Sequence, residues 1–131
     1  MRGIKVLLSV CVIVLQGCGG TVAAKKTDRG ATISADYGYS EKNPVKVGGV
    51  ANGPENERKY LDRLTGPNGE TVTYIRLGSC CAFESKNGIM GMGMLDRYEI
   101  TIEGKGEKKI LYLNMYDKDE LFAPKGLLLK N

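Results

Sequence analysis

The chain begins with a hydrophobic segment that is too short to be a transmembrane helix. Arg2 and Lys5 introduce residues 6–15, a run of ten residues without a charge. A transmembrane helix needs about 20 apolar residues, whereas a basic start followed by about 7 to 15 apolar residues is typical of a secretory signal peptide. We therefore expect residues 1–17 to be a signal peptide that takes no part in the fold.

The end of this segment resembles the lipobox of bacterial lipoproteins. Leu15 lies three residues before Cys18, and the small residue Gly17 directly precedes it. The resemblance implies acylation of the Cys18 thiol, cleavage between Gly17 and Cys18, and acylation of the freed amine, with palmitate as a typical chain. Several acyl chains hold a protein firmly on a membrane. No acidic residue follows Cys18 directly, which favours the outer membrane, facing the periplasm, over the inner membrane.

The rest of the chain is predicted to be a tether followed by one small domain. Residues 18–35 are rich in small and polar residues and show no apolar periodicity, as expected of a flexible tether. The 96 residues from 36 to 131 are enough for one core. The whole chain has 18 glycines and no histidine. The glycines predict many turns, and the lack of histidine excludes chemistry that needs an imidazole.

One segment, residues 54–65, carries the signals of a helix. Asn52 or Gly53 is the expected cap, and a proline and two glutamates follow in the first turn. A glycine and a proline at residues 66–67 should end the helix. The apolar residues form one narrow stripe, made of Tyr60, Leu61 and Leu64. A stripe of this kind should pack on a sheet.

The most regular strand pattern is a hairpin joined by a turn at residues 104–107. Apolar side chains alternate with polar ones along both strands, which indicates a sheet with one buried face. The side chains expected on that face are Tyr98, Ile100, Ile102, Leu111, Leu113 and Met115. We therefore expect an antiparallel hairpin here.

Other strands are less regular. Residues 71–77 alternate, and shorter candidates are residues 45–48, residues 80–84 before a turn at Asn87-Gly88, and residues 127–130. Together with the helix, they predict an α+β domain. Its core would be a small antiparallel sheet of about four or five strands with one helix packed on it.

Two adjacent cysteines remain in the mature chain, because signal cleavage removes Cys11 and acylation consumes Cys18. If the strand runs unbroken through Gly78, Cys80 and Cys81 point to opposite faces of the sheet and are structural thiols, the interpretation that we favour. A vicinal disulfide would be strained, because neighbouring Cα atoms are about 3.8 Å apart and disulfides usually join Cα atoms about 4.4 to 6.8 Å apart. A metal or redox site is the third interpretation.

Three methionines provide the support for a metal site. Met90, Met92 and Met94 alternate with glycines, and thioethers together with thiolates form the soft ligand set that suits Cu(I). The alternative is that these side chains fill gaps in an irregular core. A site forms only if the fold brings the methionines against Cys80 and Cys81. Structural zinc sites usually need four Cys or His ligands, so zinc is less favoured.

Four segments resemble a family of small bacterial lipoproteins of unknown role: residues 37–49, 78–81, 94–99 and 113–117. The resemblance implies that the residues in family motifs include Tyr37, Tyr39, Cys80, Cys81 and Tyr116. Members of that family often carry the label 2-dehydro-3-deoxyphosphooctonate aldolase, an enzyme that joins phosphoenolpyruvate to arabinose 5-phosphate. Such aldolases are TIM barrels of about 250 residues, which 96 residues cannot close. Aldolase activity is therefore only a remote alternative.

These features favour a lipid-anchored, non-enzymatic binding or assembly module of the cell envelope. It would contact the membrane through its acyl anchor, need no cofactor, and bind another envelope protein or a small ligand. The net charge of +4 falls to about +2 without Arg2 and Lys5, and both signs are interspersed. This pattern argues against nucleic-acid binding. The alternative is a thiol or Cu(I) protein that uses Cys80 and Cys81.

Overall fold

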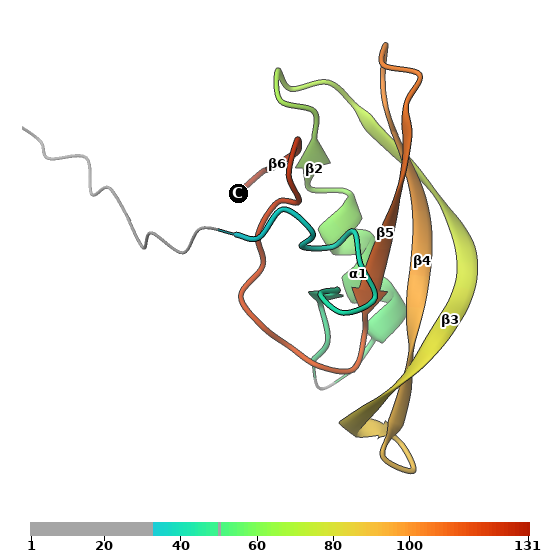
Figure 1. Cartoon of the computed structure of the whole chain (residues 1–131). Coiled ribbons are helices and arrows are strands. Elements are labelled where there is room, and N and C mark those ends of the chain that lie inside the picture. Colours follow the sequence, from blue (N-terminus) through green and yellow to red (C-terminus); the bar gives the residue numbers. More distant parts are fainter. Residues whose placement is uncertain (1–32, 50) are drawn as a thin grey trace, which may run out of the picture. The chain divides into compact units, whose positions relative to one another are not determined.

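The computed structural model describes residues 33–49 and 51–131 (Figure 1). The expected signal peptide, the expected acylation site Cys18 and most of the expected tether lie outside these residues. The described elements are β1 (Val45–Lys46), α1 (Gly53–Leu61), β2 (Leu64–Thr65), β3 (Val72–Ile89), β4 (Met92–Ile102), β5 (Lys108–Asn114) and β6 (Leu128–Leu129). Within this part of the chain, no helix has the length and apolar character needed to cross a membrane.

The domain has the α+β architecture that the sequence predicts. Four strands form one sheet in the order β1-β5-β4-β3, and β2 pairs with β6 in a second, two-stranded sheet. β4 is antiparallel to both β3 and β5, but β1 is parallel to β5, with Val45 opposite Leu113. The sheet is therefore mixed. A parallel pair needs a long connection, and here α1, β2, β3 and β4 all lie between β1 and β5 in the chain.

The hairpin of β4 and β5 is confirmed. Tyr98 lies opposite Leu111, and residues 103–107 connect the two strands. The expected apolar face is buried at its centre, whereas Met115 lies beyond the end of β5 and is half-buried. Figure 1 shows α1 on one side of this sheet, so that the core forms between them. The buried apolar residues that α1, β4 and β5 contribute are Tyr60, Leu61, Tyr98, Ile100, Leu111 and Leu113.

The helix ends earlier than its sequence predicts. It begins after Asn52 as expected, with a proline in its first turn, but stops at Leu61 and does not continue to residue 65. Leu64 is buried, as the apolar stripe indicates, yet it belongs to β2 and lies opposite Leu129 of β6. The backbone of residues 64–65 pairs with a strand near the C-terminus, a partner that local sequence does not reveal.

The segment after Val72 is one long strand, although the sequence suggests two short ones. β3 has 18 residues, and the chain reverses at Met90 and Gly91, not at Asn87-Gly88. Both turn residues have positive φ values, 54° and 80°, as a two-residue hairpin turn of type I′ requires. Asn87 is engaged elsewhere, because its side-chain amide donates a hydrogen bond to Asp117.

One buried carboxyl group lies between the helix and the sheet. The side chain of Glu57, on α1, is fully buried, and the Tyr98 hydroxyl donates a hydrogen bond to its Oε2 atom over 2.9 Å. Burial, and then the negative charge of Asp96, raises the pKa of Glu57 to about 8. Glu57 is therefore mostly protonated at neutral pH, which avoids an unpaired charge in the core.

The raised pKa predicts a stability that falls with rising pH. The unfolded chain releases the Glu57 proton near pH 4.5, whereas the folded domain keeps it until about pH 8. The free energy of unfolding should fall by up to about 1.4 kcal/mol per pH unit in this window and level off above it. Glu57→Gln stays neutral, so it should remove most of the slope and be more stable than wild type at pH 8.5.

Urea unfolding between pH 5 and pH 9 measures this slope. The slope can be assigned to Glu57 more directly than in most proteins, because the chain has no histidine that titrates in the same pH range. Glu55→Gln is the matched control, since Glu55 lies on the same helix with a pKa lowered by Lys59. That control should keep the wild-type slope. An unchanged slope in Glu57→Gln would contradict the prediction.

Candidate functional site on the β3–β4 hairpin

β3 is interrupted by irregularities near its middle. Its register with β4 shifts between Arg76 and Gly78 and again between Cys80 and Ala82. A third shift lies nearer the turn, where Glu84 and Ile89 both pair with Met92. Gly78 has a φ of 113° and Cys81 a φ of 58°. A positive φ is easy for glycine but uncommon for other residues. Such bulges bend a strand and increase its twist, so the part of the hairpin beyond them takes a new direction.

Cys80 and Cys81 are joined to each other by a disulfide bond. The expectation that they point to opposite faces was wrong, because it required an unbroken strand and the register shift at Cys81 ends the alternation. Both residues are half-buried. Of the three interpretations left open by the sequence, the structure therefore has the vicinal disulfide.

An ion pair between the exposed Arg76 and the buried Asp96 fixes the start of the bend. Both carboxylate oxygens of Asp96 accept hydrogen bonds from the Arg76 guanidinium, at 2.8 and 3.0 Å, and one also accepts a bond from the Ser79 hydroxyl. Asp96 is 1% exposed. Burial alone would raise its pKa, but the hydrogen bonds from Arg76 and Ser79 hold the pKa of Asp96 below its usual value. The residues on either side of Gly78 are thus tied to β4.

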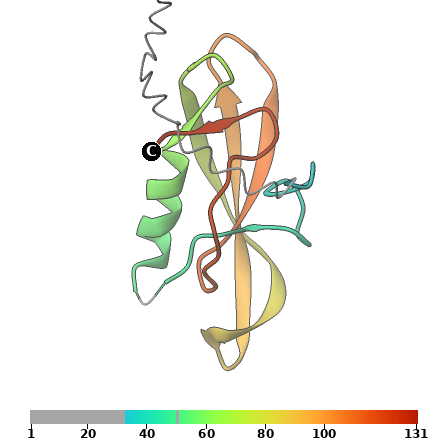
Figure 2. The same ribbon diagram turned by 90° about the vertical axis from the view of Figure 1, so that its left-hand side faces the viewer.

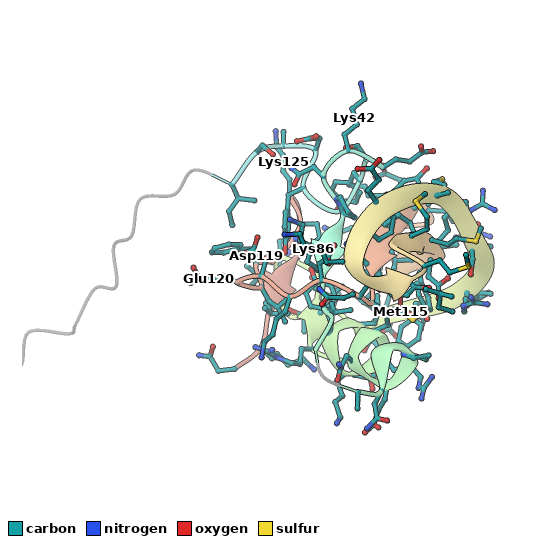
Figure 3. All side chains as sticks on the ribbon, turned by 90° about the horizontal axis from the view of Figure 1, so that it is seen from below. Lys42, Lys86, Met115, Asp119, Glu120 and Lys125 are labelled. Carbon is teal, nitrogen blue, oxygen red and sulfur yellow. A yellow bond between two sulfur atoms is a disulfide. The ribbon has the colours of Figure 1, made fainter. Side chains whose placement is uncertain are left out.

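Beyond the bulges, residues 82–94 form what we call the outer hairpin. Figure 2 shows it projecting past the end of α1, and Figure 3, seen from below, shows its ribbon curled nearly into a ring. One side packs on the segment after β5: the rings of Phe83 and Tyr116 meet edge to face, 6.0 Å apart. A Cβ atom on Gly93 would clash with both rings. The outer hairpin therefore has one side closely packed.

Polar contacts hold the same side in place. The Ser85 hydroxyl and the Asn87 amide both donate hydrogen bonds to Asp117, at 2.6 and 3.0 Å. The bond from Ser85 is the largest influence that lowers the pKa of Asp117. The Asn114 amide donates to the other oxygen of this carboxylate. Asp117 thus links the outer hairpin to the end of β5.

The other side of the outer hairpin exposes apolar side chains. Met90, at the turn, is 97% exposed, and Ile89 is 79% exposed. Met92 and Met94 are a little less than half exposed. Ile89 lies directly opposite Met92, and residues two apart in a strand share a face, so Ile89, Met92 and Met94 line one surface. We call these three residues and Met90 the apolar face.

The methionines are spread along the hairpin and do not gather around the cysteines. Met94 lies opposite Ala82, next to Cys81, but Met92 lies opposite Glu84, and Met90 is at the turn. Register therefore brings only Met94 close to the disulfide. The predicted set of two thiols and three thioethers is not assembled as one cluster along this hairpin.

Glu41 is a neighbour of the cysteines that the sequence analysis missed. One carboxylate oxygen of Glu41 and the sulfur atoms of Cys80 and Cys81 all lie within 4.8 Å of one another. Glu41 is exposed and comes from the turns before β1, 39 positions before Cys80 in the sequence. No local pattern indicates this contact, because it depends on how the hairpin curls. The disulfide thus lies beside a negative charge.

Asp96 and Glu57, in contrast, could have been found from the sequence. Asp96 extends the alternation of Tyr98 and Ile100 by two residues, which places it on the buried face. Glu57 precedes Tyr60 by three residues and lies on the same helical stripe. A carboxyl group on a buried stripe indicates a partner or a raised pKa.

No protein-family model, curated protein or solved structure matches this chain. The resemblance to small bacterial lipoproteins therefore stays a prediction. A functional proposal has to rest on the side chains of the site and on the sequence features at the N-terminus.

Proposed function

We propose that this protein is a lipid-anchored, non-enzymatic binding module of the cell envelope, which holds another envelope protein on its apolar face. The observation that supports it most is the exposure of Ile89, Met90, Met92 and Met94 together at the turn end of the β3–β4 hairpin. Single exposed apolar residues are common on protein surfaces, but a group of them on one surface is typical of an interaction site.

The structure around the apolar face supports this proposal. Its backbone is held from behind by the Phe83–Tyr116 contact and by the hydrogen bonds to Asp117. A surface held in this way loses little backbone freedom on binding. Methionine side chains are flexible and polarizable, and they adapt to the shape of a partner. The face therefore combines a fixed backbone with adaptable side chains.

The anchor is supported by the sequence alone. The basic start, the ten-residue apolar run and the Leu15-to-Cys18 motif agree with one another. Cys18→Ser should abolish incorporation of labelled palmitate and leave the precursor uncleaved, because the modified thiol is required for both steps. Metabolic labelling with cell fractionation measures this outcome. Cys11→Ser is the matched control and should keep the label, while label retained in Cys18→Ser would contradict the anchor.

Site-specific cross-linking tests the apolar face. A photo-reactive amino acid at position 90 of the acylated protein should give a discrete protein adduct in envelopes, and the same probe at Leu128 should not. Leu128 is a suitable control because it is apolar and 51% exposed but lies in β6, away from the hairpin. Replacing Met92 and Met94 together by Ser should reduce the adduct at least about tenfold, since buried methionines contribute about 1.5 to 3 kcal/mol each.

Other adducts would contradict this assignment. Equal protein adducts from positions 90 and 128 would show that the face is not selective. Adducts with lipid alone would show that the outer hairpin touches the bilayer and not a protein. Circular dichroism of the Met92 and Met94 variant checks that a reduced adduct does not come from unfolding.

A second candidate function is binding of a soft metal ion by the reduced cysteines. The observation that favours it is the negative charge of Glu41 near both sulfur atoms, with Met94 next in register. Two thiolates and a thioether suit Cu(I), and a carboxylate nearby stabilises a cation. Reduction must precede binding, because the two sulfur atoms are bonded to each other in this structure.

Titration of the reduced protein with Cu(I) against a chromogenic competitor tests this candidate. One equivalent should bind, Cys80→Ser with Cys81→Ser should abolish binding, and Met94→Leu should weaken it by about tenfold or more. Met90→Leu is the matched control, because Met90 lies at the hairpin turn. Binding that survives the double cysteine variant would exclude the site.

A further inference from the structure

The disulfide between Cys80 and Cys81 is poorly suited to stabilise the fold. In the chain-entropy account, a disulfide stabilises a protein by closing a loop in the unfolded chain, and the effect grows with the length of the loop. Here the two residues are adjacent, so the closed loop is the shortest that a chain can form. The bond ties no distant segments together. Its presence in a half-buried position of a long strand therefore needs another explanation.

The backbone at the disulfide is held in an uncommon conformation. Cys81 has a φ of 58° inside a β-strand, and the register with β4 shifts beside it. A non-glycine residue at a positive φ of this size is strained and persists only where the surrounding structure holds it. The Cα atoms of the pair are 3.8 Å apart, below the range of about 4.4 to 6.8 Å that disulfides usually span. Geometry of this kind makes a disulfide easier to reduce.

We propose that the Cys80–Cys81 pair is a redox-active site whose reductant is a protein dithiol. A partner thiolate attacks one sulfur atom of the pair, forms a mixed disulfide with it and breaks the Cys80–Cys81 bond. The other cysteine leaves as a thiolate and takes up a proton. The second partner thiol, after losing its proton, attacks the partner's sulfur atom of the mixed disulfide. The partner's own disulfide forms, and the cysteine released from the mixed disulfide leaves as a thiolate and takes up a proton. Two electrons and two protons thus pass from the dithiol to Cys80 and Cys81.

Glu41 sets the rate of the first step. Its carboxylate lies within 4.8 Å of both sulfur atoms, so it repels an approaching thiolate and disfavours the thiolate that leaves. At this distance two unit charges in water interact by an energy that corresponds to about a fourfold change in rate. Removing the charge of Glu41 should therefore accelerate reduction by about fourfold or more.

Reduction also frees the backbone on one side of the site only. Once the disulfide is reduced, the Cys81 side chain is no longer held against that of Cys80. Cys81 can then return to an extended conformation, and the register shift beside it can disappear. The register shift between Arg76 and Gly78 remains, because Arg76 and Ser79 donate hydrogen bonds to the buried Asp96. The change is therefore confined to the outer hairpin, and it does not depend on the partner proposed for the apolar face.

Equilibration of the full acylated protein in detergent with dithiothreitol buffers tests the proposal. Without denaturant, the disulfide should be reduced and re-formed reversibly, as measured by thiol alkylation and mass spectrometry. Hydrogen exchange should rise in residues 82–94 on reduction and stay unchanged in β5. A disulfide that yields only when the protein is denatured would overturn the proposal, as would two thiols that stay free under oxidising buffer.

Two variants separate the role of Glu41 from a general effect of charge. Glu41→Gln should increase the rate of reduction by about fourfold or more. Glu103→Gln removes the same charge at the far end of β4 and should leave the rate at the wild-type value. Equal rates in all three proteins would overturn the role of Glu41. The readouts are thiol counts, reduction rates and hydrogen exchange of the protein alone. They can therefore fail or succeed whether or not a partner binds the apolar face.

Discussion

The buried carboxylate of Asp96 is the group on which the rest of the structure depends. It accepts hydrogen bonds from Arg76 and Ser79, on either side of Gly78, and so fixes the first irregularity of β3. Its negative charge also helps to keep Glu57 of α1 protonated, by raising the pKa of that residue. A buried charge is tolerated only when it is paired and hydrogen-bonded. The helix, the central strand and the bend therefore share one electrostatic arrangement.

The bend gives the outer hairpin two different sides. A straight β3 would carry the outer hairpin away from the segment after β5. Neither of the two faces on which its side chains alternate would then be covered. Because the chain turns at the bulges, Phe83 and Ser85 reach Tyr116 and Asp117, while Ile89 and the methionines stay outside. Gly93 is required for this packing, since any side chain there would meet the two rings. The exposed apolar face is thus a consequence of the packing behind it.

The sequence predicts those parts of the fold whose partners are close along the chain. Alternation identifies the β4–β5 hairpin, and Asn52 and Pro54 identify the start of α1. The end of α1 is missed because Leu64 pairs with Leu129. The prediction of a turn at Asn87-Gly88 is wrong, because the Asn87 side chain donates a hydrogen bond to Asp117 and the chain reverses later. The first bulge depends on a carboxylate 17 to 20 residues away, and Glu41 reaches the cysteines only through the curl of the hairpin.

The proposed redox site and the apolar face lie in one hairpin. The disulfide lies at the start of the outer hairpin, beside the register shift between Cys80 and Ala82, and reduction is proposed to release that shift. A shift by one residue moves side chains to the opposite face. A partner that prefers the oxidised hairpin must then stabilise the disulfide to the same extent, because coupling between two equilibria is reciprocal. For a two-electron couple, a tenfold preference lowers the reduction potential by about 30 mV. Under the two proposals, binding at the apolar face and reduction of Cys80 and Cys81 would each shift the equilibrium of the other.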